Sequence, residues 1–316
     1  MGPPEEAQAL VRESLAIQQQ SGDQREVASA LRVLGWIALD AGRLRESERL
    51  ARESVAAFQA VGDRARAAEA LANLGQTSAH LGELAKAEAQ LEESVAIYGD
   101  LGFSGSSCVA ALSMLGGVEL YLGRYDRARA LAQESLAKAR QSGLRLWVGG
   151  ALMRLGWVAM AEGEYEKARQ FCEQSSSYLK EPPDHVALAY VTRGLGQTTQ
   201  VQHHICKALH MGAGRGGPLG LAHVLPAVAL LLVDRGEVER AVELYALALR
   251  YPYVGNAPIY EDLAAKHIAA AAKALPPEVV EAAQARGRAR DLEATVRELL
   301  AEFQEEGVLY EPQQDE

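Results

Sequence analysis

Apolar residues along the chain recur at intervals of three and four positions, and each such stretch runs into a glycine. In "ASALRVLGWIALDAG" (28–42) the apolar side chains share one helical face, and Gly42 closes the stretch. A glycine ends a helix well because it adopts the left-handed backbone conformation at low cost. The pattern therefore predicts helices joined by tight turns.

This pattern repeats with a period near 40 residues. Leu-Gly pairs stand at 34–35, 74–75, 115–116, 155–156 and 195–196, with spacings of 40, 41, 40 and 40. After the first four pairs a turn glycine, a small residue and a serine follow at fixed offsets: Gly42, Gly82, Gly123 and Gly163; Ser47, Ala87, Ala128 and Ala168; Ser54, Ser94, Ser135 and Ser175. A fixed period of this length indicates an array of helical hairpins.

Glycines and small residues also predict how these helices pack. Glycine inside a helix costs about 1 kcal/mol relative to alanine, so we expect a neighbouring helix to approach closely at the glycine of each Leu-Gly pair. The small residues of the second helix allow the same tight packing. The turns "SGD", "VGD" and "LGF" at 21–23, 61–63 and 101–103 are expected to end the second helices.

The placement of the Leu-Gly pair, the turn glycine and the alanine resembles tetratricopeptide repeats over residues 5–250. The usual repeat has about 34 residues, so these helices are longer; HEAT-like repeats approach 40 residues but lack this placement. The resemblance implies an all-α, right-handed superhelical solenoid of hairpins. We expect the array at 5–252, with a shortened hairpin at about 186–218, capping helices at 253–304 and a disordered tail at 305–316.

The fifth hairpin departs from the pattern. Leu195-Gly196 looks like the pair inside a first helix, but no turn glycine follows it. The array resumes at Gly236, whose Leu-Gly equivalent is Val228-Ala229, 33 residues after Leu195. Seven residues, about two helical turns, are therefore missing, and we place the loss between Gly196 and Cys206. We expect a stunted hairpin joined near 198–202; the alternative is one bent helix through 187–211.

The C-terminal part begins where "YPYVGNAP" (251–258) breaks the repeat, and helical segments follow at 259–275, 276–289 and 291–303. Together with the preceding "ERAVELYALALRYPYVGN", this end resembles the C-terminus of bacterial signal-transduction ATPases with numerous domains and of related transcriptional regulators. The resemblance implies an array that senses a ligand or partner in the bacterial cytoplasm. The 316 residues contain no nucleotide-binding motif, so ATPase activity is not expected.

Composition narrows the function further. The net charge of −10 argues against a nucleic-acid partner, and no apolar run is long enough to cross a bilayer. The chain opens without a signal peptide, and its three cysteines are typical of buried thiols in a cytosolic protein. "GAGRGGPLG" (212–220) lacks the Gly-Lys-Ser/Thr of a phosphate loop, and no Ser-His-Asp arrangement is legible. We therefore expect neither a cofactor nor an enzyme.

The first helix, 5–23, matches a second helix whose partner does not precede it. Such a helix exposes an apolar side, so self-association through 5–23 is one expected role. We interpret the chain as cut from a longer protein, with Met1-Gly2 as a cloning remnant. The alternative is a native capping helix that starts at Pro3-Pro4.

A solenoid of this type binds its partner on the concave side, which the first helix of each hairpin lines. The register places these residues there: Arg32, Trp36, Asn73, Gln76, His80, Tyr121, Met153, Trp157, Arg193 and Gln197. Trp36 and Trp157 are the strongest candidates, since tryptophan often dominates binding energy. In the alternative interpretation both tryptophans fill the groove between hairpins.

One further group has metal-ligating chemistry. His203, Cys206 and His210 lie at i, i+3 and i+7 on one helical face and could bind zinc, but a fourth ligand is missing, so packed or surface histidines are the preferred interpretation. We therefore expect a non-enzymatic scaffold for a protein or peptide, including other domains of a parent protein. The alternative is a small-molecule sensor that controls an upstream nucleotide switch.

Overall fold

Glycines with positive φ set the lengths of the helices. The computed structural model describes residues 4–179, 184–213 and 217–307. From Gly22 to Gly163 a glycine with φ between 61° and 78° stands every 20 or 21 residues: Gly22, Gly42, Gly62, Gly82, Gly102, Gly123, Gly143 and Gly163. Both kinds of turn therefore close in the same way, and the period near 40 residues consists of two nearly equal helices. The predicted helix ends are confirmed at all of these glycines except Gly143, where no helix end was predicted.

The chain divides into two compact units, residues 1–119 with 126–148 (unit 1) and residues 120–125 with 149–316 (unit 2). This division falls inside the array that we expected at 5–252, and the boundary between array and cap stays a prediction. Unit 1 contains α1 (Pro4–Ser21), α2 (Gln24–Asp40), α3 (Leu44–Ala60), α4 (Arg64–His80), α5 (Leu84–Asp100), most of α6 (Ser106–Tyr121), most of α7 (Tyr125–Gln141) and the start of α8 (Arg145–Ala161).

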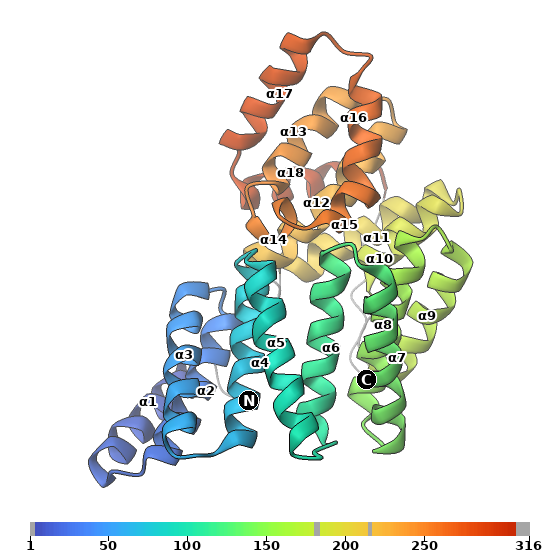
Figure 1. The fold of residues 1–316 in the computed structure, drawn as a ribbon. Helices are drawn as coiled ribbons and strands as arrows, with labels where there is room; N and C mark the ends of the chain where they lie inside the picture. Colours follow the sequence, from blue (N-terminus) through green and yellow to red (C-terminus); the bar gives the residue numbers. More distant parts are fainter. Residues whose placement is uncertain (1–3, 180–183, 214–216, 308–316) are drawn as a thin grey trace. The chain divides into compact units, whose positions relative to one another are not determined.

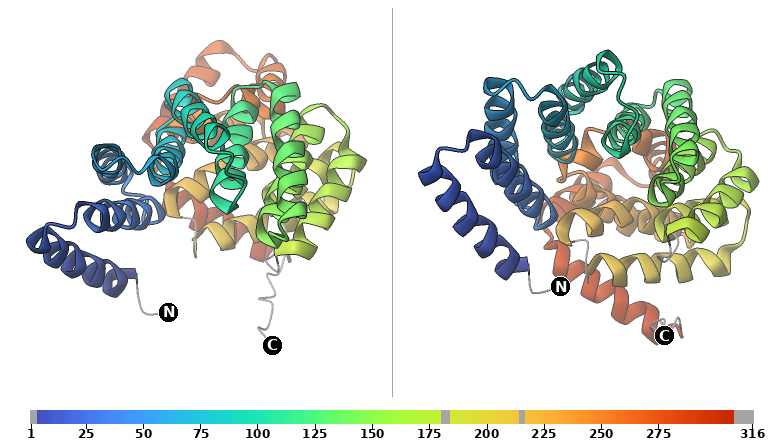
Figure 2. Two further views of the ribbon diagram at one scale, coloured as in Figure 1. Left: turned by 60° about the horizontal axis from the view of Figure 1, so that its bottom comes forward. Right: turned by 90° about the horizontal axis from the view of Figure 1, so that it is seen from below.

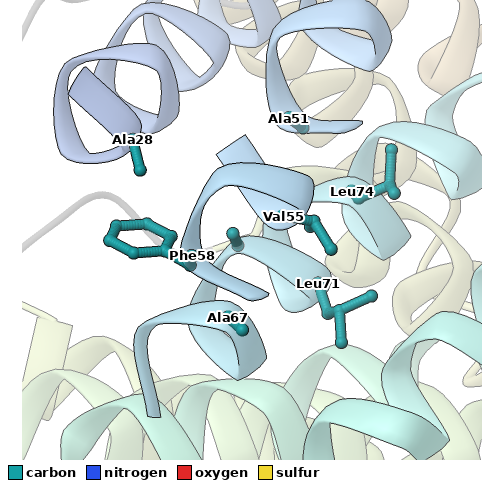
Figure 3. Close-up of a cluster of buried hydrophobic side chains, with 8 residues drawn as sticks. Ala28, Ala51, Val55, Phe58, Ala67, Leu71 and Leu74 are labelled. Carbon is teal, nitrogen blue, oxygen red and sulfur yellow. The ribbon is translucent and has the colours of Figure 1, made fainter. Parts of the chain in front are cut away.

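Within unit 1 consecutive helices pack as antiparallel neighbours, α2 on α3, α3 on α4 and α4 on α5 (Figure 1). Aspartates start two of them: Asp23 accepts hydrogen bonds from the backbone N–H groups of Arg25 and Glu26, and Asp63 from that of Arg66. Figure 3 shows the core of α2, α3 and α4, where the fully buried Phe58 is surrounded by small and aliphatic side chains such as Ala28.

The recurring serines bind one helix of each hairpin to the other. Each serine hydroxyl of a second helix donates a hydrogen bond to the carbonyl 26 residues earlier, in the first helix: Ser54 to Ala28 at 2.8 Å, Ser94 to Ala68 at 2.6 Å and Ser135 to Val109 at 3.4 Å in unit 1, and Ser175 to Gly149 at 2.8 Å in unit 2. All four serines are buried. The period thus repeats a polar contact as well as a small side chain.

Replacing Ser94 with alanine is expected to lower the free energy of unfolding by about 1 kcal/mol, because the buried bond to Ala68 is lost. The matched control is Ser177→Ala, since Ser177 is exposed and bonds only within its own helix. Urea denaturation of both variants measures the difference. Equal midpoints for Ser94→Ala and the wild type would show that this contact does not stabilise the hairpin.

Unit 2 contains the remainder of α8, then α9 (Tyr165–Leu179), α10 (His185–Gly194), α11 (Thr198–Met211), α12 (Gly217–Asp234), α13 (Val238–Ala248), α14 (Pro252–Gly255), α15 (Pro258–Tyr260), the π-helical η2 (Glu261–Ala265), α16 (Lys266–Ala272), α17 (Pro277–Ala289) and α18 (Leu292–Glu305). All secondary structure in the described part of the chain is helical. The predicted all-α class of tetratricopeptide-like hairpins is confirmed.

The fifth hairpin corrects the predicted register. Gly196 has φ 73° and ends α10, so Leu195-Gly196 is the turn itself and not the pair inside a helix. Gly196 follows Gly163 by 33 residues and precedes Gly236 by 40, so the loss lies before Gly196 and not between Gly196 and Cys206. The stunted hairpin is correct and the single bent helix is wrong. Its turn is at 195–197 instead of 198–202. The prediction was misled because a Leu-Gly pair also occurs at turns, where a leucine precedes Gly82 and Gly123.

The C-terminal helices α16 and α17 lie within the predicted segments 259–275 and 276–289, and α18 extends two residues beyond the predicted 291–303. Asp291 caps α18 as expected, accepting from the backbone N–H of Ala294 at 2.8 Å. α18 runs to Glu305, and Glu306 pairs with Arg235 at 2.8 Å. The first residues of the predicted disordered tail are therefore ordered, and 308–316 lie outside the described residues.

Candidate functional site

The predicted binding residues of unit 1 lie on α2 and α4 and differ in exposure. Trp36 is 55% exposed, so the alternative in which it fills a groove between hairpins is wrong. Arg32 is half-buried and pairs with Glu69 at 3.2 Å. The half-buried side chains on α4 are Asn73, Gln76 and His80.

Trp157 in unit 2 has the opposite environment. It is 7% exposed, and its indole Nε1–H donates to Asp184 Oδ2 at 2.8 Å. Its ring centroid lies 6.1 Å from Tyr190, in an edge-on contact, and 5.3 Å from His223. Met153 lies one helical turn before Trp157 on α8 and is half-buried. The second predicted tryptophan therefore belongs to a polar and aromatic group drawn from several helices.

We call this group the Trp157 cluster and define it as Tyr121, Arg154, Trp157, Asp184, Tyr190, His223, Tyr253 and Tyr260. Its members come from the end of α6, from α8, from the N-cap and body of α10, and from α12, α14 and α15. All of them belong to unit 2.

Asp184 holds two parts of the cluster in place. Its Oδ1 accepts the backbone N–H groups of Val186 and Ala187, each at 3.1 Å, and so starts α10. Its Oδ2 accepts the indole N–H of Trp157. The carboxylate therefore fixes the tryptophan ring and the helix start together.

His223 joins the cluster to the segment that follows the last hairpin. Its Nδ1 is hydrogen-bonded to the Tyr260 hydroxyl, its ring lies edge-on to Tyr260, and it stacks on Tyr253 at 6.4 Å. Burial lowers the pKa of His223, although Asp184 acts in the opposite direction, and burial raises the pKa of Tyr260 well above 10. A neutral imidazole and a protonated tyrosine therefore share this hydrogen bond, and the tautomer of the imidazole decides which of them donates.

Arg154 and Tyr121 are desolvated but still reachable. Burial lowers the pKa of Arg154, opposed by Tyr121, and burial raises the pKa of Tyr121. Both side chains nevertheless keep part of their surface accessible. The arginine remains a cation at neutral pH, so the cluster presents a positive charge in surroundings of low polarity.

Tyr190 carries an unsatisfied hydroxyl. The side chain is 5% exposed, and its oxygen has no hydrogen-bond partner among the described residues. The sequence did not identify Tyr190 or Arg154. The correct register would have found Tyr190, because it precedes Gly196 by six residues, as Trp157 precedes Gly163 and Trp36 precedes Gly42.

Sequence comparison identifies the repeat. Profiles described as tetratricopeptide repeat match residues 1–60 and 106–181 in one case and 67–101 in the other, together more than half of the chain. The chain is a tetratricopeptide-repeat protein. No curated protein sequence matches it. Among the described helices, none has both the length and the apolar character needed to cross a membrane.

Solved structures share the fold at low identity. A Rap protein complexed with competence and sporulation factor has a TM-score of 0.56 and 13% identity over 89% of this chain and 87% of that one. BtubC (BKLC) from P. vanneervenii has a TM-score of 0.53 and 16% identity over 69% and 94%. A signal transduction ATPase with numerous domains and a tetratricopeptide repeat sensor, from Pyrococcus horikoshii, has 0.51 and 16% over 83% and 42%. No catalytic family is among the matching profiles.

Two predicted residues of the tetratricopeptide array have other roles. Arg193 binds Asp234 through two hydrogen bonds of 2.7 and 2.8 Å, and Gln197 is the N-cap of α11. Both residues lie beside the turn because Gly196 is the turn glycine. They were predicted as binding residues because the expected register placed Gly196 inside a helix. The cluster is therefore not extended by either residue.

The ligating atoms of His203, Cys206 and His210 do not converge as a group in the described residues. His210 Nδ1–H donates to the Cys206 carbonyl at 2.9 Å, and His203 packs against His204. Burial raises the pKa of Cys206, which favours the thiol over the metal-binding thiolate. In the described residues the ligating atoms that converge are those of Glu88, Glu92 and Glu119, and Arg127 pairs with all three.

A histidine pair lies inside the shortened hairpin. His185 Nδ1 on α10 and His204 Nδ1 on α11 are 3.0 Å apart, and the rings stack with centroids 5.2 Å apart. Burial, the largest cause, acts together with the neighbouring His203 and Lys207 to lower the pKa of each to about 4. Both rings are therefore neutral at physiological pH, and one nitrogen donates to the other.

Proposed function

We propose that the chain is a non-enzymatic peptide- or protein-binding module and that the Trp157 cluster is its recognition site. The observation that carries the proposal is that Tyr190, whose hydroxyl has no partner among the described residues, lies edge-on to Trp157, with the half-buried Arg154 on the same helix as Trp157. Tetratricopeptide repeats generally mediate protein–protein binding, which supports the class of partner. The similar Rap structure is a complex with competence and sporulation factor, which is consistent with the same class.

The chemistry of the cluster defines the ligand group. A guanidinium in surroundings of low polarity binds a carboxylate or a carbonyl oxygen more strongly than it does in water. The hydroxyl of Tyr190 adds a donor without a partner among the described residues, and the rings of Trp157 and His223 offer apolar contact. The net charge of −10 disfavours nucleic acid.

Selection from a phage-displayed library of random peptides tests this site. Peptides selected on the wild type are expected to bind at least about tenfold more weakly to Arg154→Met and to Tyr190→Phe, as measured by isothermal titration calorimetry. Tyr190→Phe keeps the ring and removes only the hydroxyl, so a folding defect does not explain its effect. Lys167→Met, on the exposed face of α9, is the control and should bind like the wild type. Unchanged affinity in both cluster variants would contradict the assignment.

The broader role that we propose is the sensor or interaction region of a larger bacterial signalling regulator in the cytoplasm. The resemblance of the C-terminal sequence supports it, as does the likeness to the protein with a tetratricopeptide repeat sensor. Isolation of bound proteins from the source cell, with the wild type and with Trp36→Ala and Arg154→Met, tests this role. Recovery of the same proteins by all three would contradict it.

A small-molecule sensor is the second candidate, favoured by the number of aromatic rings in the cluster. Tyr253, Tyr260 and His223 pack around one another, as they would around a flat ligand. Native mass spectrometry of the protein purified from its source measures a bound mass. An adduct that disappears in Arg154→Met would favour this candidate over a peptide.

A further inference from the structure

Helix α1 exposes a face that its counterpart buries. Leu10 and Ile17 lie at i and i+7 and are 66% and 61% exposed. A shift of 40 residues aligns "RESLAIQ" (12–18) with "RESVAAF" (52–58), so Leu10 corresponds to Leu50, which is 5% exposed. Figure 2 shows α1 at the outer edge of unit 1 with α2 beside it. In α3 the equivalent position is buried against other helices, whereas in α1 this face is exposed.

Unit 2 contains an apolar groove of about 980 Å³ that is lined by residues of α13, α16 and α17. These three helices lie near one another in Figure 1. One wall is a row of alanines on the same face of the α16 segment, Ala265, Ala269 and Ala272. The lining includes Leu249, which is 44% exposed. Small wall residues let a further helix approach closely, and the open side leaves room for it.

The apolar lining is specific to α13. Val242 and Ala246 stand six and ten residues after the turn glycine Gly236. The same positions after Gly82 and Gly123 are charged or polar: Glu88 and Glu92 in α5, Arg129 and Gln133 in α7. The repeat alone does not require apolar residues here, so the groove is a feature added to the last hairpin.

The net charge of α1 is negative, whereas the net charge of the groove rim is positive. The sequence of α1 contains three acidic residues and one basic residue. The rim of the groove carries the cations Arg250, Lys273 and Arg288 against the acids Glu261 and Glu281. An acidic amphipathic helix therefore fits this groove better than a basic one.

We propose that the Leu10–Ile17 face of α1 in one copy docks in the α13/α16/α17 groove of a second copy. The two surfaces are different, so a single contact of this kind is head-to-tail and leaves one groove and one α1 available. Such contacts produce open chains unless the rotation closes a ring. This self-association is separate from ligand binding at the Trp157 cluster.

Sedimentation of mixed variants tests the contact. The wild type is expected to gain mass with concentration beyond that of a dimer. Leu10→Asp with Ile17→Asp blocks the helix face, and Leu249→Asp with Ala269→Asp blocks the groove; each double variant alone should be monomeric. An equimolar mixture should form a dimer and stop there, because only one intact helix face and one intact groove remain. All four positions are exposed, so the folds should persist, and circular dichroism checks this.

Charge reversal gives an independent readout. Glu13→Lys is expected to weaken association at least fivefold, and Lys273→Glu with Arg288→Glu in the partner copy should restore it. A wild type that is monomeric at every concentration would overturn the proposal. So would a wild type that associates while the mixed variants stay monomeric, since that result indicates a symmetric contact instead.

Discussion

Replacing Gly287 with alanine is expected to lower the free energy of unfolding by about 3 kcal/mol. Gly287 lies on α17 where this helix crosses α13, and a Cβ there would be 2.0 Å from the carbonyl oxygen of Glu243 and 2.9 Å from Ala246 Cβ. The nearest atom belongs to the backbone of a helix and cannot rotate away. The two helices must separate, and the ion pairs of Arg286 and Arg290 with Glu243 are strained with them.

Urea denaturation of Gly287→Ala measures this effect, and Gly150→Ala is the matched control. Gly150 is also inside a helix, α8, but a Cβ there meets no atom within 4 Å. Its replacement should raise stability by about 0.5–1 kcal/mol through helix propensity alone. Opposite signs for the two substitutions are therefore expected. A Gly287→Ala protein as stable as the wild type would show that α13 and α17 do not touch as described.

Acidification from pH 6.5 to about 4 is expected to cost about 2–3 kcal/mol of stability through the His185–His204 pair, after allowance for solvent screening. Burial lowers the pKa of both histidines from 6.5 to about 4 in the folded chain. Between these pH values the unfolded chain binds more protons than the folded chain. Stability is therefore complete above pH 6.5 and falls as the pH approaches 4, where α10 and α11 must accept buried charge.

Denaturant midpoints across this pH range measure the loss. The double variant His185→Phe with His204→Phe keeps stacked rings but cannot titrate at these positions, so it should lose about 2–3 kcal/mol less stability than the wild type from pH 6.5 to 4. The loss that remains comes from other groups such as His223, whose pKa burial also lowers. Below that range the variant should still lose stability, because the hydrogen bond from Lys86 holds the pKa of Glu48 at about 2. His267→Gln, on the exposed side of α16, is the control with an unchanged profile. A wild type with no loss between pH 6.5 and 4 would contradict the assignment.

Most of the fold could be predicted from the sequence because a local signal repeats. Turn glycines need only their own backbone conformation, so Gly42 and Gly163 could be assigned without tertiary contacts. The expected close approach at the glycines inside helices was less general. A Cβ on Gly75 would lie 2.7 Å from Leu91 Cγ, whereas Gly35 and Gly156 have ordinary contacts of 3.4 Å or more.

The candidate site was only partly predictable because its residues come from distant segments without a shared period. Trp157 could be found from its position in the repeat, and Tyr190 was hidden only by the misplaced register. His223 and Tyr260 have no such repeat position. His223 follows residues 214–216, where the sequence does not show the repeat, and Tyr260 lies beyond the last hairpin. Their hydrogen bond depends on tertiary packing that a linear pattern does not encode.

The division of labour between the two oxygens of Asp184 has a mechanical consequence. One oxygen of this carboxylate holds the first turn of α10, and the other holds the tryptophan ring. A ligand of the proposed site that turned the indole away would leave Oδ2 without this donor, while Oδ1 would still accept the N–H groups at the start of α10. We expect the effect of such a ligand to reach the start of α10 first, the helix of 10 residues that opens the shortened hairpin.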